Sequence, residues 1–137
     1  MDEAVRRAMA KWPDVPGAFD WLALDARGRW LLRGERITNP LLIDFIGRNY
    51  AADPHGRWYF QNGPQRVFVA LAYTPWVLRL NADGRLDTHT GKRVTELRQG
   101  RIDRAGNVIL DTEHGAGLID DRDLDALSSR IVDASGA

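Results

Sequence analysis

Apolar and polar residues alternate along much of the chain in short runs, a period typical of strands with one buried face. Stretches rich in Gly, Asp, Asn or Pro separate these runs. The sequence therefore predicts a sheet of about seven or eight strands. The segments with this pattern are 20–24, 29–33, 57–62, 65–73, 75–81, 85–90, 94–98 and 107–112, with a short further piece at 117–119.

The composition of individual strand faces gives more specific expectations. In 65–73 both alternating sets of side chains are apolar, which predicts a central strand covered on both faces. In the next strand, alternation places Leu78 inward and Val77 outward. Trp58 shares a strand face with Phe60, so we expect it to lie in the core.

Three other segments have helical signals. Residues 2–11 place acidic residues first and basic residues last, as the helix dipole favours. Asn39-Pro40 is a helix start followed by apolar residues at helical spacing, which predicts a helix at about 40–51 packed on the sheet. Asp120 begins an acidic stretch with an apolar stripe, which predicts a C-terminal helix over 120–132.

The pattern Asp/Asn-x-x-Gly occurs four times between predicted strands. The Asp or Asn side chain opens a type I turn, and we expect the Gly to close it with a positive φ. The first three copies are 28 residues apart, which fits either a degenerate structural repeat or convergent use of one turn chemistry. The four copies are Asp25–Gly28, Asp53–Gly56, Asn81–Gly84 and Asp103–Gly106.

These signals together predict the fold class α+β. We expect one domain over 1–137, with a twisted antiparallel sheet, the central helix at about 40–51 and short terminal helices. Degenerate turn–strand repeats are one way in which such a domain is built.

Composition excludes several classes of site. The 137 residues include no cysteine, which excludes disulfides, thiolate metal sites and a thiol nucleophile. No apolar run is long enough to span a membrane, and the N-terminus lacks the pattern of a signal peptide. We therefore expect a cytoplasmic protein with no membrane partner.

Charge is unevenly distributed although the formal net charge is zero. Residues 26–101 carry a net charge of +7, and residues 102–137 carry −5. We expect the acidic tail to pack against the basic middle and neutralise part of it. The other interpretation is a surface that binds anions.

Nucleic-acid binding through the Arg-rich middle is one form of that second interpretation. Single-strand binders combine a basic groove with stacking aromatic side chains. The zero net charge and the core-type positions of the tryptophans weigh against it. The residues concerned are Arg29, Arg57, Arg66, Arg79 and Arg85, with Trp30, Trp58, Tyr59 and Phe68.

Candidate chemistry is sparse. Asp87 and His89 lie two residues apart on one predicted strand, so their side chains share a face. They could act as a base with its orienting carboxylate, or they could be a polar pair on a solvent-exposed face. Asp111, Glu113 and His114 could bind a divalent cation, but their spacing matches no metal motif. No catalytic or cofactor-binding motif is present, so we expect no catalytic residue, no cofactor and no metal.

Part of the chain resembles a bacterial family of unknown function whose members are small α+β proteins with repeated structural motifs. The likeness covers 28–79, and it rests on turn and core residues. It implies the fold and a role in signal transduction, but no activity. The residues that carry it are Gly28-Arg-Trp30, Gly34-Glu-Arg-Ile37, Asn39-Pro-Leu-Leu42, Asp53-x-x-Gly56-x-Trp-Tyr-Phe, Gln65-x-Val67 and Thr74-Pro-Trp-Val77.

The leading functional expectation is a non-enzymatic module that binds a small ligand or a protein partner, with a role in signalling. The first alternative is a small enzyme with its site at Asp87 and His89. The second is nucleic-acid binding through the Arg-rich middle. The sequence identifies neither the ligand nor the oligomeric state.

Overall fold

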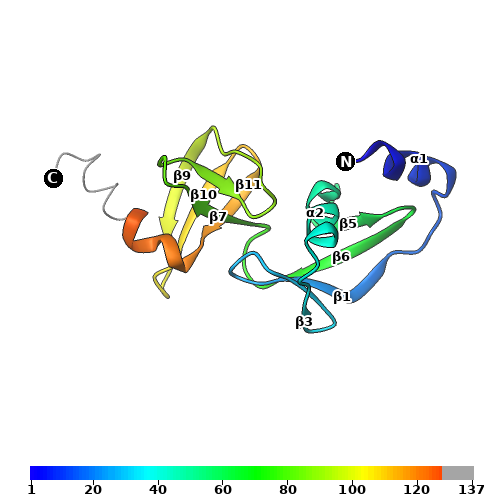
Figure 1. The fold of residues 1–137 in the computed structure, drawn as a ribbon, viewed down its shortest axis with the longest axis horizontal. Coiled ribbons are helices and arrows are strands. Elements are labelled where there is room, and N and C mark those ends of the chain that lie inside the picture. Colours follow the sequence, from blue (N-terminus) through cyan, green and yellow to red (C-terminus); the bar gives the residue numbers. More distant parts are fainter. Residues whose placement is uncertain (128–137) are drawn as a thin grey trace. The chain divides into compact units, whose positions relative to one another are not determined.

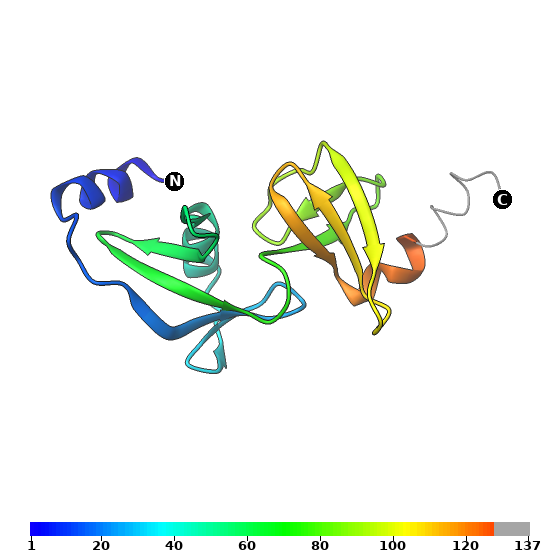
Figure 2. The same ribbon diagram turned by 180° about the vertical axis from the view of Figure 1, so that it is seen from behind.

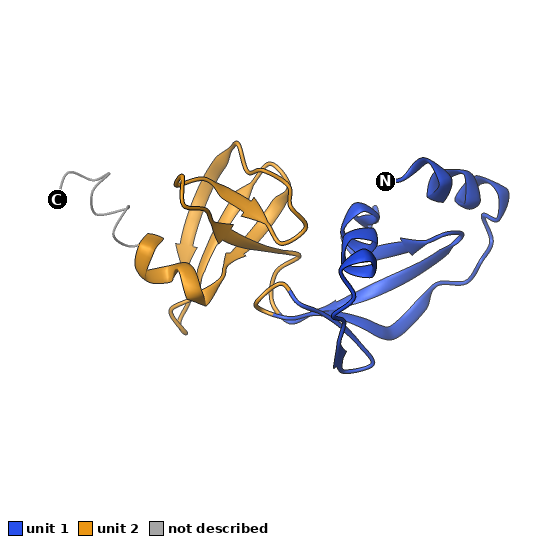
Figure 3. Ribbon diagram, viewed as in Figure 1, with its two compact units in different colours: residues 1–25, 29–72 blue, residues 26–28, 73–137 orange. Residues whose placement is uncertain are grey.

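Two separate sheets, not the single sheet of seven or eight strands that the sequence predicts, form the α+β fold of the computed structural model, which describes residues 1–127 (Figure 1). The chain divides into two compact units. The first comprises 1–25 and 29–72, and the second comprises 26–28 with the described residues from 73 onward (Figure 3). Within 1–127, no helix has the length and apolar character needed to cross a membrane.

The first unit contains two helices and a six-stranded mixed sheet. Its strand order is β3-β2-β1-β6-β5-β4, and all neighbours are antiparallel except the parallel pair β1 and β6, which run side by side in Figure 1. The elements are α1 (Glu3–Lys11), β1 (Ala18–Leu24), β2 (Trp30–Leu32), β3 (Glu35–Arg36), α2 (Pro40–Arg48), β4 (Tyr50–Ala52), β5 (Trp58–Asn62) and β6 (Gln65–Leu71).

The second unit, green to orange in Figure 2, has a five-stranded mixed sheet in the order β8-β7-β11-β10-β9. Its strands β7 and β11 are parallel. The predicted C-terminal helix begins with the 3-10 turn η1 (Asp121–Asp123) and continues as α-helix to residue 127. Its remaining part, 128–132, lies outside the described residues. The strands are β7 (Trp76–Leu80), β8 (Leu86–Thr88), β9 (Leu97–Ile102), β10 (Val108–Thr112) and β11 (Gly115–Ile119).

The two units share one strand skeleton. In each, a first strand turns back on a second, and the last three strands form an antiparallel meander. The final strand then lies parallel beside the first: β6 beside β1, and β11 beside β7. The predicted turns occupy matching places, because each unit has one after its first strand and one inside its meander.

All four predicted turns are present, and their glycines have the expected positive φ. Asp25 shows how such a turn is held: its Oδ1 accepts from the backbone N–H of Arg29 (2.8 Å), and its own N–H donates to the Arg29 carbonyl (3.0 Å). A further turn of this kind, with the Thr88 hydroxyl in place of the carboxylate, was not predicted. The φ values are +79° at Gly28, +79° at Gly56, +85° at Gly84 and +84° at Gly106.

The expected helix at 40–51 ends early. Its start is confirmed, because the Asn39 side chain accepts from the Leu41 N–H (2.9 Å). The helix ends at Arg48, and Tyr50 begins β4 instead of the last helical turn. Tyr50 pairs with Phe60 across the sheet, so sheet pairing overrides the helical spacing at this point.

The burial of two strands is the reverse of the expectation. β6 is central, but only Val67 is fully buried on it and Ala70 is exposed, so one of its faces is only partly covered. On β7 both Val77 and Leu78 are buried, at 1% and 0% exposure, so this strand is covered on both faces. Trp58 is less buried than predicted: it is half-buried and not a core residue.

Candidate ligand-binding site

Asp87, one of the two residues of the predicted polar site, is tied to neighbouring side chains. It lies on β8 opposite Arg79. Its Oδ2 accepts from the side-chain amide of Asn81 (2.9 Å), and its Oδ1 lies 2.7 Å from Nε of Arg93. These contacts hold the carboxylate in place as a structural anion of the second unit.

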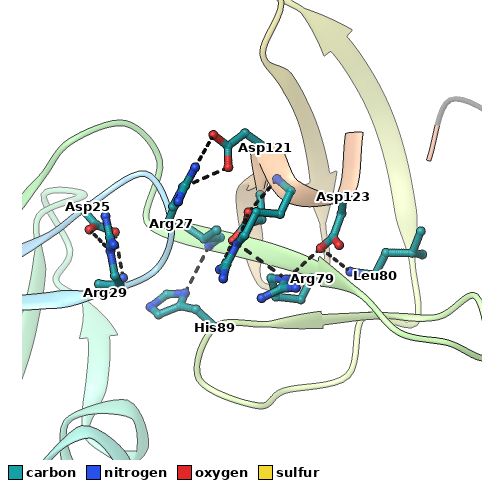
Figure 4. A network of polar contacts seen from close by, with 11 residues as sticks. Asp25, Arg27, Arg29, Arg79, Leu80, His89, Asp121 and Asp123 are labelled. Atoms are coloured by element: carbon teal, nitrogen blue, oxygen red, sulfur yellow. Dashed lines mark hydrogen bonds and ion pairs between the residues drawn. The ribbon is translucent and has the colours of Figure 1, made fainter. Parts of the chain in front are cut away.

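His89, the second residue of that predicted site, reaches β7. Its Nδ1 accepts a hydrogen bond from the backbone N–H of Val77 (3.1 Å; His89 is labelled in Figure 4). Its ring lies 5.7 Å from that of Trp76. Since Nδ1 accepts, this contact selects the neutral tautomer with the proton on Nε2. These contacts join Asp87 and His89 to different partners.

The possible cation ligands also have other roles. Asp111 pairs with Arg101 (3.3 Å), and His114 contacts the Arg93 carbonyl through Nε2 (2.9 Å). Hydrogen bonds from the Thr95 side chain and backbone outweigh burial and lower the pKa of Glu113 to about 2. Residues 1–127 contain no group of three or more side chains placed to hold a metal ion.

Carboxylates neutralise much of the expected Arg face. Three of its five arginines make close ion pairs: Arg29 with Asp25 (2.6 Å), Arg57 with Asp53 (2.7 Å) and Arg79 with Asp123 (2.8 Å). The first two belong to the Asp-x-x-Gly turns, in which the carboxylate pairs with the residue four positions later. The pattern that supplies the basic residues therefore also supplies their counter-ions.

The described part of the acidic tail pairs with the basic middle, as expected. Asp121 binds Arg27 through two hydrogen bonds of 3.0 and 3.1 Å, and Asp123 binds Arg79 (Figure 4). Asp120 is fully buried and accepts from the Arg122 side chain at 2.6 and 2.9 Å. Burial opposes ionisation of Asp120, but the hydrogen bonds from Arg122 prevail and lower its pKa to about 2.

Arg66, on β6 of the first unit, differs from these arginines. Its guanidinium carbon lies 4.0 Å from the ring centroid of Tyr59, within cation–π range. It makes no ion pair with any residue in 1–127 and is half-buried. It is therefore a cation whose charge no described carboxylate neutralises.

Arg66 lines a cavity of the first unit, which we call the Gln61 cavity. Its volume is about 360 Å³. The alternation of β5 and β6 places it on the sheet face opposite Phe60 and Val67, which line another cavity. It is lined by Met9, Trp12, Pro13, Val15, Gly17, Gln61, Pro64, Arg66 and Phe68.

Gln61 is the most unusual member of this lining. It is 2% exposed, and its side-chain amide donates to the carbonyl of Gly63 (3.0 Å). That bond fixes the orientation of the amide, because a flipped amide would place Oε1 against the carbonyl oxygen of Gly63. Its Oε1 is buried and accepts no hydrogen bond from the described residues. A buried acceptor without a donor costs about 1–3 kcal/mol of stability, so it is a place where a ligand would be stabilising.

The cavity on the opposite sheet face is smaller than the Gln61 cavity and mainly apolar. Its volume is about 220 Å³, and Leu42 and Ile46 of α2 face Phe60 and Val67 of the sheet across it. None of its lining residues is charged. It lacks the unpaired cation and unsatisfied acceptor that single out the Gln61 cavity.

Sequence reasoning missed the Gln61 cavity. Its residues come from α1, the connector that follows it, and the β5–β6 hairpin. The one local signal was a Gln directly before the Asn62-Gly63-Pro64 turn, a place where an exposed polar residue is ordinary. Arg66 was included in the Arg face, but nothing in the sequence separated it from its paired neighbours.

Comparison with solved structures supports the fold. No curated protein matches the chain. The crystal structure of a DUF1285 family protein from Silicibacter pomeroyi DSS-3 matches with a TM-score of 0.61 and 17% identity, covering 87% of this chain and 73% of that one. A DUF1285 family protein from Shewanella baltica OS155 matches with a TM-score of 0.60 and 13% identity, covering 80% and 91%. At this identity the likeness concerns the fold alone.

A family model gives the wider relationship. The model DUF2944, described as "Protein of unknown function (DUF2946)", matches residues 1–136. The expected membership of an uncharacterised domain family is confirmed, whereas the signalling role and the repeats stay predictions. The chain belongs to this family of proteins of unknown function.

Proposed function

We propose that the protein is a non-enzymatic module that binds a small ligand in the Gln61 cavity of its first unit. The observation that carries this proposal is a buried acceptor, Gln61 Oε1, in the wall of a cavity that Arg66 also lines. The volume of about 360 Å³ falls in the range of small-molecule sites, which combine apolar walls with a few polar groups.

A thermal-unfolding screen of the full chain tests the proposal. A ligand that binds the native state raises the apparent melting temperature. We expect a hit from a panel of metabolites, and we expect Val15→Phe to abolish it, because Val15 lines the cavity and Phe fills it. Val94→Phe, at a half-exposed site of the second unit, is the matched control and should keep the hit.

Two results contradict the proposal. One is a panel without any hit. The other is a hit that survives Val15→Phe unchanged, because the ligand then binds elsewhere.

Three expectations from the sequence stay predictions alongside this proposal. They are a cytoplasmic location, a role in signalling and a single domain over 1–137. The enzyme alternative at Asp87 and His89 also stays a prediction, and the contacts of these residues with Asn81, Arg93 and Val77 give it no added support.

Nucleic-acid binding is the weaker alternative. Arg29, Arg57 and Arg79 already pair with carboxylates, so phosphates would have to displace these partners. Binding of single-stranded oligonucleotides at physiological salt would restore this alternative.

A further inference from the structure

The charge in the Gln61 cavity favours a ligand of negative charge. Arg66 is the only charged residue among those that line it. At the rim, Lys11 Nζ lies 5.7 Å from the ring centroid of Trp12, which places a second cation nearby. A guanidinium that is half-buried and has no described carboxylate partner favours an anion, because a charge-assisted hydrogen bond then replaces lost water contacts.

The side chains that line the cavity indicate the shape and polarity of the part of the ligand that does not carry the charge. Trp12 is 56% exposed and presents a large apolar ring at the rim, while Met9, Pro13 and Pro64 are apolar. At Gly17 the backbone lies so close to Phe68 that an added Cβ would be 2.7 Å from its ring edge. Apolar side chains therefore form part of the wall beside the polar groups, and about 360 Å³ suits a body of one or two rings.

Gln61 indicates which further polar group the ligand carries. Its amide nitrogen is already bonded to Gly63, so the unsatisfied atom is the acceptor Oε1. A matching ligand therefore carries an N–H or O–H donor, and an analogue without that donor leaves the oxygen unsatisfied.

From these three features we infer that the ligand class is a small ring-bearing organic acid, with its anionic group on Arg66 and an N–H or O–H donor for Gln61. This inference rests on the proposed function. A neutral or cationic molecule of the same shape fits the walls but leaves Arg66 without a counter-ion.

Calorimetric titration of the full chain with three matched probes tests the class. Indole-3-acetate has both the anion and the N–H donor. Indole-3-acetamide lacks the anion, and 1-methylindole-3-acetate lacks the N–H donor. We expect the acid to bind about tenfold more tightly than the amide and severalfold more tightly than the methylated acid.

Variants assign each preference to its residue. Arg66→Gln should remove the difference between acid and amide, and Arg85→Gln, an exposed arginine of the second unit, should leave it unchanged. Gln61→Met keeps the side-chain length and should remove the difference between the two acids. Arg66→Lys should retain part of the charge preference, because it keeps the cation without the planar guanidinium.

The outcomes separate this inference from the proposed function. If the amide binds as tightly as the acid, or Arg66→Gln leaves the charge preference intact, the ligand class is wrong and the cavity remains a binding site. If the probes fail but a compound without a negative charge binds in a Val15-dependent way, the class is again wrong. If no probe and no panel compound binds, both the proposed function and the class are wrong.

Discussion

The parallel strand pair is buried differently in the two units, although both units share one strand skeleton. In the second unit the pair β7 and β11 is covered on both faces, with Val77 and Leu78 both buried. Gly28 lies over Val77, because a Cβ at Gly28 would be 3.4 Å from that of Val77. In the first unit the pair β1 and β6 is buried on one face and only partly covered on the other.

The partly covered face of the first unit carries the side chains on which the proposed function rests. Phe19 is 53% exposed and stacks on Phe68, with ring centroids 4.5 Å apart, and Arg66 lies over Tyr59 on the same face of the strands. In the second unit, Arg27 and Arg79 are paired with acids of the tail. One strand skeleton can therefore have its parallel pair buried on both faces, as in the second unit, or buried on one face and partly exposed on the other, as in the first.

Truncation of one core residue in each unit gives the largest expected effect and tests whether the units unfold together. Trp30 and Leu86 are both buried and both follow a Gly-Arg turn. Trp30→Ala should cost roughly 3–5 kcal/mol and Leu86→Ala roughly 2–5 kcal/mol. If 1–137 is one domain, each variant raises amide hydrogen exchange in both units. Faster exchange in the mutated unit alone would show two domains.

Removal of the buried carboxylate of Asp120 should weaken the second unit next. Asp120→Ala leaves Arg122 without its partner and should cost roughly 2–3 kcal/mol, below the range for a fully buried pair because Arg122 reaches solvent. Denaturant unfolding measures the change. Asp44→Ala, an exposed member of an ion pair with Arg48, is the control and should cost less than about 1 kcal/mol. Equal costs would mean that burial of Asp120 adds nothing.

Two turn glycines separate backbone strain from steric overlap. Gly28 and Gly56 both have φ of +79°, so Ala at either position should cost about 1 kcal/mol for the left-handed conformation. At Gly28 the new Cβ would also be 2.7 Å from the Cβ of His89, whereas at Gly56 nothing lies within 4 Å. Gly28→Ala should therefore lower the melting temperature more than Gly56→Ala. The opposite ranking would contradict the close approach.

Acid should also weaken the fold, and the loss of stability should begin in the second unit. The pKa of Asp120 and that of Glu113 are each lowered to about 2, from ordinary values of 3.8 and 4.5. A lowered folded-state pKa contributes stability above the unfolded value, and this is lost as pH falls toward the folded value. Stability should therefore decline between about pH 4.5 and pH 2. A flat unfolding free energy over this range would contradict both shifts.

Local chemistry explains what the sequence predicted correctly. The turn at Asp25 is held by a side chain that bonds four residues away, so its signal and its partner lie in one short segment. The start of α2 at Asn39 is held in the same local way. The strand predicted at 94–98 lies instead at Leu97–Ile102, as β9. The prediction missed the preceding turn, because Thr88 holds it through a hydroxyl instead of a carboxylate.

Long-range pairing explains what was missed. The split into two sheets depends on parallel pairs such as Ala18 with Val67, and no pattern within either strand specifies that partner. The Gln61 cavity has the same origin, because Met9 and Phe68 meet only after the fold forms. Burial of Val77 on β7 likewise depends on Gly28, which is distant in the chain.

The parallel closure of each unit has a consequence for synthesis on the ribosome. β1 emerges early but must wait for β6, the last strand of its unit, and β7 must wait in the same way for β11. Until then one edge of each early strand is unpaired, and such edges can join strands of neighbouring nascent chains. Contacts that are distant in sequence also form slowly. Each unit is therefore complete only when its final strand has left the exit tunnel.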